Sequence, residues 1–205
     1  SEWSKKQFLL NLDPFYHKSE KLKVIHQSIN KCKVSFKNKK KTIVFVGKLN
    51  SAKGYDIFAE AIIKILNKYT EWNAIVIGDE PREKIEVYHK NLKHYGFTTH
   101  NKVLDTFSKS SIAVACSRWE EPFGRTSLEA SSRGCAVIIS NRGGLPETIT
   151  DGIILKKINS NELYNSIENL ILNKTKLNKL QIQSYKKFFL TDKYSSSKID
   201  NYRNK

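Results

Sequence analysis

Methionine is absent from this 205-residue sequence, and cysteine occurs only three times, as Cys32, Cys116 and Cys135. Because no initiator residue is present, we expect either a processed chain or, as we favour, a fragment of a longer protein. The cysteines are odd in number and lack metal-ligand spacing, which argues against a disulfide framework and a zinc site. Cys116 and Cys135 border apolar runs, so we expect buried free thiols in a reducing cytosol.

Long hydrophobic runs are also missing, although hydrophobic residues make up 39% of the chain. None of the runs approaches the ~20 residues that a membrane-spanning helix needs. The segment Ser1–Lys6 leads only into a brief Phe8–Leu10 cluster, which lacks the pattern of a secretory signal peptide. We therefore expect a cytoplasmic location, at most peripheral to the inner face of a membrane.

Acidic residues are few beside basic ones: 20 Asp and Glu stand against 36 Lys and Arg, a net charge of +16. Such a balance favours anionic partners, namely nucleic acid, anionic lipid or phosphate-bearing substrates. The charge is spread out except for Lys37–Lys41, which abuts the first clear strand and is more typical of a linker than of a nucleic-acid patch. A basic nucleic-acid-binding module stays an alternative that rests on charge alone, because no basic strand carries interleaved aromatic residues.

Apolar, β-branched runs alternate with helical patterns along the chain. Their continuous apolarity is typical of strands buried on both faces of a parallel sheet. The predicted strands cover 42–46, 73–77, 112–116 and 136–139, with 22–25 as a candidate for one more, and the predicted helices cover 54–69, 125–133 and 161–172. This alternation predicts an α/β fold, with ligands bound beyond the carboxyl ends of the strands. The polar tail after Thr191 is expected to be a helix that docks elsewhere.

The first candidate site follows strand 42–46. Gly47 turns the chain, and Lys48 and Lys53 flank a loop that opens the next helix at Gly54. Backbone amides at a helix N-terminus and two ammonium groups can cradle a diphosphate. A solvated loop that happens to contain lysines is the alternative.

The second candidate site follows strand 112–116 and contains Glu121, Gly124 and, seven residues after the first carboxylate, Glu129. A loop glutamate can accept hydrogen bonds from sugar hydroxyls, and a helical glutamate can bind the two hydroxyls of a ribose. The alternative is that Glu121 caps a helix or faces solvent while Glu129 pairs with Arg133 four residues on.

The third candidate site is Gly143-Gly144-Leu-Pro-Glu147, after strand 136–139. The glycine pair permits close approach of a ligand, and Glu147 could serve polar recognition or cap the following turn. No Asp-x-Asp pair and no cluster of His, Cys and carboxylates is present, so we expect no metal and no cofactor.

Together the three sites resemble those of retaining glycosyltransferases of the GT-B fold, family four. The resemblance covers roughly residues 20–150 and is carried by the order, spacing and strand context of five motifs. These are Phe45-Val-Gly-Lys-Leu49, Lys53-Gly54, Cys116-Ser-Arg-Trp-Glu-Glu-Pro-Phe-Gly124, Ser127-Leu-Glu-Ala130 and Gly143-Gly-Leu-Pro-Glu147.

The resemblance implies two Rossmann-like domains that face a cleft, of which this chain looks like the C-terminal, donor-binding one. Residues 1–36 would then be the end of the preceding acceptor domain, with a helix over Ser1–Leu12, and a linker. Residues 37–205 would be the nucleotide-sugar-binding domain, a parallel sheet with helices on both faces. Its last helix, about 176–205, would cross back toward the acceptor domain.

The resemblance also assigns roles to individual residues. Lys48 and Lys53 would contact the diphosphate beside Gly47, Glu121 would bind the hydroxyls of the donor sugar, helped by the amides of Phe123, Gly124 and Arg125, and Glu129 would bind the ribose. The family usually has arginine at the position of Lys48, and a lysine keeps the charge but loses the bidentate fork. The segment 96–104, where nucleobase contacts usually fall, matches poorly.

The activity implied is transfer of a sugar from a nucleoside-diphosphate sugar with retained anomeric configuration. Cations and amides directed at the departing diphosphate could replace a metal. The expected partners are the nucleotide sugar, the missing acceptor domain and a lipid or glycan acceptor at a membrane surface, without nucleic acid. A sugar-nucleotide epimerase of the same fold is the enzyme alternative. We expect this chain alone to bind donor without transferring sugar.

Overall fold

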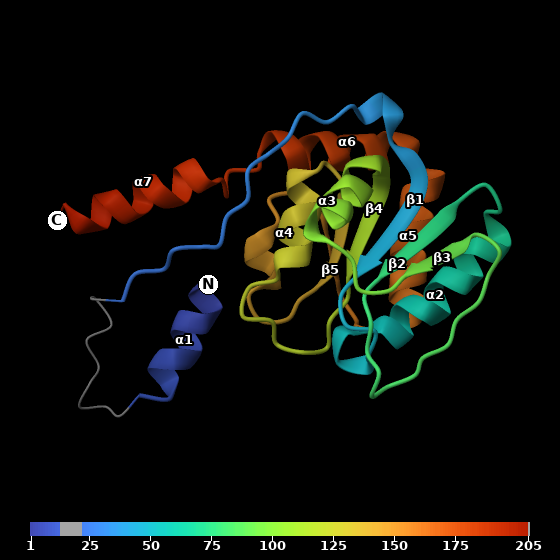
Figure 1. The fold of residues 1–205 in the computed structure, drawn as a ribbon, viewed down its shortest axis with the longest axis horizontal. Helices are drawn as coiled ribbons and strands as arrows, with labels where there is room; N and C mark the ends of the chain where they lie inside the picture. Colours follow the sequence, from blue (N-terminus) through green and yellow to red (C-terminus); the bar gives the residue numbers. More distant parts are fainter. Residues whose placement is uncertain (13–21, 205) are drawn as a thin grey trace.

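The computed structural model describes residues 1–12 and 22–204, which are shown in Figure 1. Within these residues the core is a six-stranded sheet of order β3-β2-β1-β4-β5-β6, and every pair of neighbouring strands is parallel. The strands are β1 (Lys40–Val46), β2 (Asn73–Ile77), β3 (Leu92–Tyr95), β4 (Ser110–Ala115), β5 (Ala136–Ser140) and β6 (Ile153–Leu155). The predicted α/β class with a Rossmann-like parallel sheet is confirmed.

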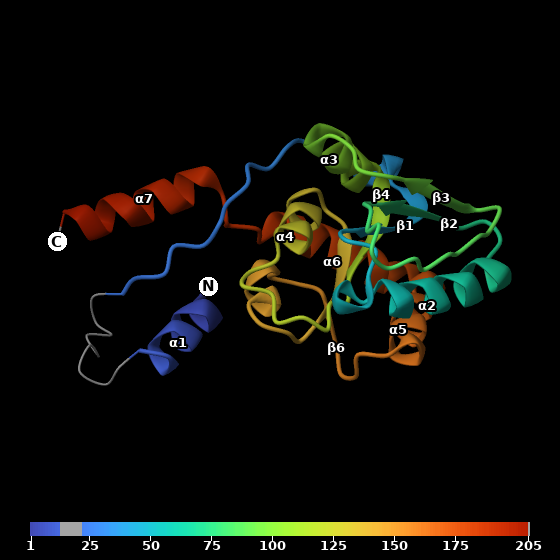
Figure 2. The same cartoon turned by 60° about the horizontal axis from the view of Figure 1, so that its bottom comes forward.

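Helices cover both faces of this sheet. The described residues form helices α1 (Glu2–Leu10), α2 (Tyr55–Lys68), α3 (His100–Lys109), α4 (Arg125–Ser132), α5 (Ser160–Leu172), α6 (Lys174–Lys186) and α7 (Asp192–Arg203), with short 3₁₀ turns η3 (Phe36–Asn38), η4 (Ser51–Lys53) and η5 (Leu145–Thr148). Figure 2 shows α3 on one side of the sheet and α2 and α5 on the other. Two buried apolar clusters correspond to these two faces, and strand residues of β1 contribute to both because successive side chains alternate.

The apolar periodicity of α2 explains how the first face is filled. Tyr55, Phe58, Ile62 and Ile65 are fully buried on one stripe of this helix, and the rings of Tyr55 and Phe58 pack against that of Phe45 on β1. This packing fixes where α2 begins, and therefore where the loop that precedes it lies.

Four predicted strands and three predicted helices are confirmed, with ends that differ by no more than two residues. The predicted strand at 22–25 is wrong, because these residues form no ladder. Strand β3 was not predicted, because only Leu92 of its four residues is buried and no apolar run marks it. Strand β6 is only three residues long, too short for a periodic pattern.

The C-terminal segment differs from the single last helix expected over 176–205. It forms two helices, α6 and α7, because the chain between them turns to bury Phe188 and Leu190 beside Ile29 and Leu128. Thr191 then caps α7 by accepting a hydrogen bond from the amide of Tyr194.

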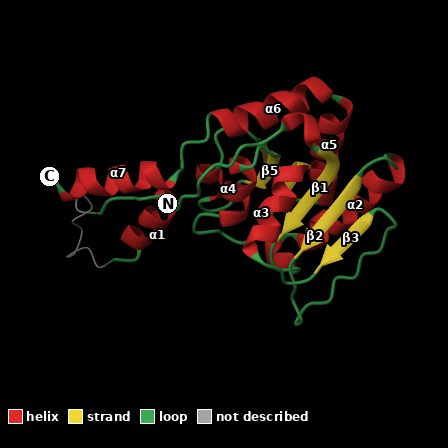
Figure 3. Cartoon of the chain, turned by 45° about the horizontal axis from the view of Figure 1, so that its top comes forward, coloured by secondary structure: helices red, strands yellow, loops and turns green. Residues whose placement is uncertain are grey.

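The two terminal helices lie beside the α/β body rather than on the sheet. Figures 1 and 3 show α1 and α7 near each other and apart from the strands. The helix expected over Ser1–Leu12 is present as α1. The assignment of residues 1–36 to a preceding domain stays a prediction, and part of that segment lies outside the described residues. No helix in the described part of the chain combines the length and apolarity needed to cross a membrane.

Candidate functional site

A cavity lies at the carboxyl ends of β1 and β4, where a parallel sheet places its ligands. Its volume is about 240 Å³, below the ~300–1,000 Å³ usual for small-molecule sites. Of the residues predicted to bind donor, five line it: Gly47, Lys53, Glu121, Gly124 and Arg125. The fold therefore brings the first two candidate sites to one edge of the sheet, although Lys53 and Glu121 are 68 positions apart in the sequence.

The loop after β1 is held by the loop after β2. The Asn50 carboxamide oxygen accepts from the Lys53 amide at 3.0 Å, and its nitrogen donates to Glu80 at 3.2 Å. The Ser51 amide donates to Glu83 at 2.9 Å. Sequence reasoning missed Asn50 and Glu80. Glu80 lies two residues after Gly78, which follows β2. The predicted sites also follow strands, so the same pattern could have identified Glu80.

A second set of contacts fixes the same loop to the start of α2. The Arg118 guanidinium donates to both carboxylate oxygens of Asp56, at 2.6 and 2.7 Å, and to the carbonyl of Ser51 at 2.8 Å. The hydrogen bonds from Arg118 lower the pKa of Asp56, which keeps the pair ionised. Gly54 has φ +72°, and a Cβ there would lie 2.2 Å from the carbonyl oxygen of Cys116. This position therefore requires glycine.

Lys53 and Glu121 form an ion pair, and both residues line the cavity. The Lys53 side chain is 31% exposed and that of Glu121 is 14% exposed. Glu121 therefore neither faces solvent nor caps a helix, which removes the alternative considered for it. Lys48 is exposed and does not line the cavity, so the structure places only one of the two predicted lysines there.

The loop that carries Glu121 is tied to the third candidate site. The Gly144 amide donates to the Glu121 carbonyl at 2.6 Å, and Glu120 accepts from the amide of Gly143. Gly143 has φ +55°, and a Cβ there would approach the Glu121 carbonyl oxygen to 2.1 Å. The glycine pair thus serves close packing of two loops of the protein against each other.

Glu129 lies in α4, outside the residues that line the cavity, and is 6% exposed. Its Oε1 accepts hydrogen bonds from Nε2 of His100 at 2.9 Å and from Nε of Arg125 at 3.2 Å. The alternative that Glu129 pairs with Arg133 is wrong, because the Arg133 guanidinium donates to the carbonyl of Asn30 at 2.8 Å instead. Sequence reasoning missed His100, which no spacing connects to Glu129.

Glu147 caps the N-terminus of helix α1 and not the turn that follows Glu147 in the chain. Its carboxylate accepts from the amides of Glu2 at 2.8 Å and Trp3 at 3.0 Å, and from Nε2 of His26 at 2.8 Å. Burial alone would raise the pKa of Glu147, but these hydrogen bonds outweigh it and the pKa is lowered. The ring of Phe123 is buried and lies 5.4 Å from that of His26. The third site therefore joins the loops after β4 and β5 to the N-terminal segment.

The expected buried thiols are confirmed for Cys116 and Cys135, whereas Cys32 is partly exposed. Burial raises the pKa of Cys116 to about 12 and also raises that of Cys135, so neither is a nucleophile at neutral pH. Within the described ranges, no group of three or more His, Cys, Asp or Glu residues is arranged to hold a metal ion.

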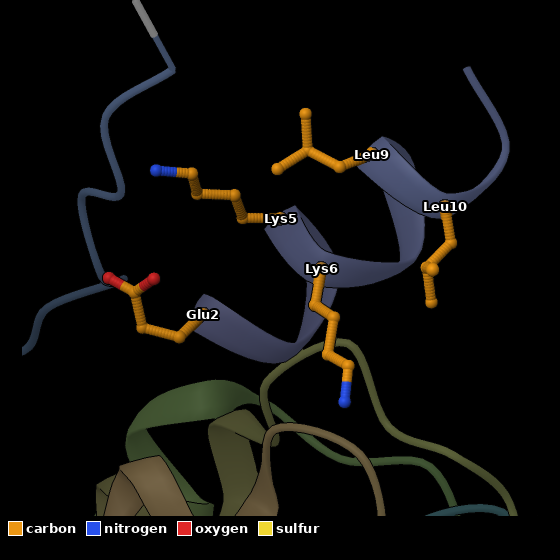
Figure 4. A pocket seen from close by; sticks show the side chains of 5 residues that line it. All are labelled: Glu2, Lys5, Lys6, Leu9 and Leu10. Carbon is orange, nitrogen blue, oxygen red and sulfur yellow. The ribbon is translucent and has the colours of Figure 1, made fainter. Parts of the chain in front are cut away.

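A separate hollow lies on α1 (Figure 4). It is lined by Glu2, Lys5, Lys6, Leu9 and Leu10, and Figure 4 shows Lys6 pointing toward the α/β body and Leu9 away from it. None of the predicted donor-binding residues lines this hollow, so we place the candidate site at the edge of the sheet.

Comparison with known proteins agrees with this geometry. The family model described as glycosyl transferases group 1 matches residues 27–187, which is more than half of the chain. A Klebsiella pneumoniae protein described as an uncharacterized 41.2 kDa protein in the cps region is 32% identical over 145 residues, which cover 69% of this chain and 39% of that protein. This chain spans about a third to two fifths of the length of the curated relatives it matches first.

Two solved structures show the same fold. One is the C-terminal domain of a glycosyl transferase group 1 family protein, LpcC, from Francisella tularensis, with a TM-score of 0.63, 27% identity, and coverage of 73% of this chain and 85% of that one. The other is Anabaena Alr3699/HepE in complex with UDP and glucose, with a TM-score of 0.69, 19% identity, and coverage of 80% and 48%. With its parallel sheet, its paired lysine and glutamate at the strand ends and the matching family model, the chain belongs to the group 1 glycosyltransferases.

Proposed function

We propose that this chain is the donor-binding part of a glycosyltransferase that takes a sugar from a nucleoside-diphosphate sugar and retains its anomeric configuration. The observation that carries the proposal is the Lys53–Glu121 pair in a cavity at the strand ends. A cation for phosphate and a carboxylate for hydroxyls lie side by side there, as a sugar diphosphate requires. The solved Anabaena relative, which holds UDP and glucose, supports the same class of ligand.

In this proposal the reaction is driven by stabilisation of the leaving diphosphate. As the bond from the anomeric carbon to the phosphate oxygen breaks, negative charge grows on that oxygen and positive charge on the sugar ring. The Lys53 ammonium, and amides at the N-terminus of α4, of which Gly124 is the N-cap, favour the first charge. Lys48 adds positive charge from the exposed rim. None of these groups requires a metal.

Glu121 binds the hydroxyls of the donor sugar, and the amides of Phe123, Gly124 and Arg125 assist it. Arg125 is the first residue of α4, so its amide is one of those without an intrahelical partner. Glu129, one helix turn further on, accepts hydrogen bonds from the ribose hydroxyls. Its burial makes it a strong acceptor, because water competes little there.

The acceptor is held by another domain of the parent protein. A cavity of about 240 Å³ is one wall of a larger site, and transfer needs the acceptor within about 3–3.5 Å of the anomeric carbon. Phe8 and Leu10 of α1 and Ile199 of α7 expose apolar side chains that such a domain would cover. The acceptor itself would be a lipid or glycan, reached from the cytoplasmic side of a membrane, where the net charge of +16 favours anionic lipid.

The chain alone is therefore expected to bind donor and to catalyse at most slow hydrolysis, because one wall leaves the sugar open to water. Incubation with the best-binding sugar nucleotide and a panel of lipid and glycan acceptors tests this. Efficient transfer by the chain alone would show that the donor-half proposal is wrong.

The proposal as a whole is tested by a thermal-shift screen of nucleoside diphosphates and their sugars, with the free nucleosides as controls. A ligand present at about 100 times its Kd stabilises a folded protein by about 2.7 kcal/mol, or about 5–10 °C for a domain of this size. No shift with any nucleoside diphosphate would contradict the proposal. The comparisons support neither the epimerase nor the nucleic-acid alternative, and product analysis separates the epimerase from a transferase.

A further inference from the structure

His100 is the first residue of α3 and lies beside Glu129 of α4, 29 positions further along the chain. Its Nε2 is 2.9 Å from Glu129 Oε1, and because a carboxylate can only accept, the ring donates this hydrogen bond. The His100 side chain is 51% exposed whereas that of Glu129 is 7% exposed. The histidine thus reaches from the surface to a carboxylate that is mostly buried.

The two oxygens of this carboxylate have different surroundings. Oε1 accepts from both His100 and Arg125, the latter at 3.2 Å. Oε2 accepts no hydrogen bond from the described residues and is not among the fully buried polar atoms without a partner, so it keeps some accessible surface on a side chain that is 7% exposed. One oxygen is held by two donors, and the other has no donor among the described residues.

Arg125 is the weaker of the two donors. Its contact with Glu129 is longer, its side chain is 57% exposed, and it also lines the cavity in which the diphosphate would lie. A bound diphosphate would compete for this guanidinium, because charge-assisted bonds to phosphate are strong. His100, which does not line the cavity, would then be the donor that keeps Oε1 fixed.

We propose that His100 is a positioning residue that sets the preference of this site for ribose over deoxyribose. By holding Oε1, His100 keeps Oε2 in the orientation that binds the ribose hydroxyls. Without His100 the carboxylate would rotate, and binding free energy would be lost in restricting that rotation. The inference rests on the proposed function, which gives Glu129 the ribose. It goes beyond that function in naming the residue that makes the carboxylate selective.

The test compares ribonucleotides with their 2′,3′-dideoxy counterparts by calorimetry on the full 205-residue chain. UDP, GDP and ADP are titrated with each dideoxy analogue, and the pair with the tightest ribonucleotide is followed through the variants. His100→Ala removes the donor, His100→Gln keeps an N–H donor on a side chain of similar reach, and Asn101→Ala is the matched control. Asn101 is exposed in the same helical turn and makes no side-chain hydrogen bond to a described residue.

With His100→Ala, the ribonucleotide should bind about threefold to tenfold more weakly, the range expected for one hydrogen bond, and the dideoxy analogue should bind as before. His100→Gln should recover most of the loss, and Asn101→Ala should match the original chain. A purely structural role for His100 predicts equal losses for both nucleotides, and that result, or no loss for either, would overturn the inference.

Glu129→Ala, measured in parallel, separates the inference from the function on which it rests. If Glu129→Ala keeps the full ribose preference, the assignment of Glu129 to ribose fails and the inference falls with it. If Glu129→Ala abolishes the preference while His100→Ala and His100→Gln both retain it, only the positioning role of His100 is wrong.

Discussion

The ammonium of Lys53 and the carboxylate of Glu121 form an ion pair that joins the loop after β1 to the loop after β4. Each partner is the group that the proposed function assigns to a different part of the donor, the diphosphate for Lys53 and the sugar for Glu121. In this structure they neutralise each other, so neither charge stays unpaired in a partly enclosed cavity. A donor must therefore share or replace this pair when it binds.

Replacing Lys53 by alanine should flatten the dependence of affinity on phosphate number. In the original chain, affinity should fall from diphosphate to monophosphate to nucleoside, because the ammonium attracts phosphate charge. Calorimetry with the three ligands measures this gradient for the original chain and for Lys53→Ala, with Lys64→Ala on the exposed face of α2 as the control. Binding should survive a chelator. A nucleoside that binds as tightly as its diphosphate would refute the role of Lys53.

Replacing Glu121 by glutamine should separate sugar recognition from diphosphate recognition. The change removes the charge that pairs with Lys53, so the ammonium becomes free for phosphate and a nucleoside diphosphate should bind at least as tightly as before. The added affinity that the sugar contributes should shrink, because a neutral amide accepts hydrogen bonds from hydroxyls less strongly than a carboxylate. Kd values for a nucleoside diphosphate and its sugar measure both effects. If both ligands weaken equally, Glu121 does not discriminate between them.

Replacing Glu129 by alanine should weaken nucleotide binding by about 1–3 kcal/mol, the loss expected for a hydrogen-bonded charged acceptor. Calorimetry with a nucleoside diphosphate measures the change. Glu162→Ala, at a half-buried position in the first turn of α5 and away from the cavity, is the matched control for loss of one carboxylate. An unchanged affinity in Glu129→Ala would show that this carboxylate does not bind the nucleotide.

Acid should release helix α1 from the body of the protein. The pKa of Glu147 is lowered in the folded state, so its contribution to α1 docking is complete above the ordinary carboxyl pKa of about 4.3 and is lost as the pH falls through the lowered folded value. Hydrogen exchange at the amides of Glu2 and Trp3, corrected for the intrinsic pH dependence of exchange, reports this release.

Glu147→Gln is the comparison for that experiment. It keeps one acceptor oxygen and the shape of the side chain but lacks the charge, so protection of the two amides should be lower at neutral pH and should vary little between pH 2 and 6, a range set by the carboxyl titration. Equal protection in the original chain and the variant at neutral pH would show that the charge of Glu147 does not hold α1.

Much of the fold could be predicted from the sequence because its evidence is local. A run such as 136–139 is buried on both faces and therefore apolar throughout, and the stripe of α2 repeats at helical spacing. Strand β3 and the break between α6 and α7 escaped prediction for the opposite reason. The first depends on pairing with β2, and the second on burial of Phe188 against distant residues.

The sequence by itself determined which residues follow the ends of parallel strands, and hence that Gly47, Lys53, Glu121 and Gly124 lie at one edge of the sheet, where they line one cavity. Only the tertiary structure decided their partners. Lys53 and Glu121 are 68 positions apart, and Glu147 meets the amide of Glu2 across 145. Spacing along a chain predicts neighbours within one helix or strand, whereas contacts across such separations are set by how loops from different strands pack. For that reason the plausible local pairing of Glu129 with Arg133 gave way to His100.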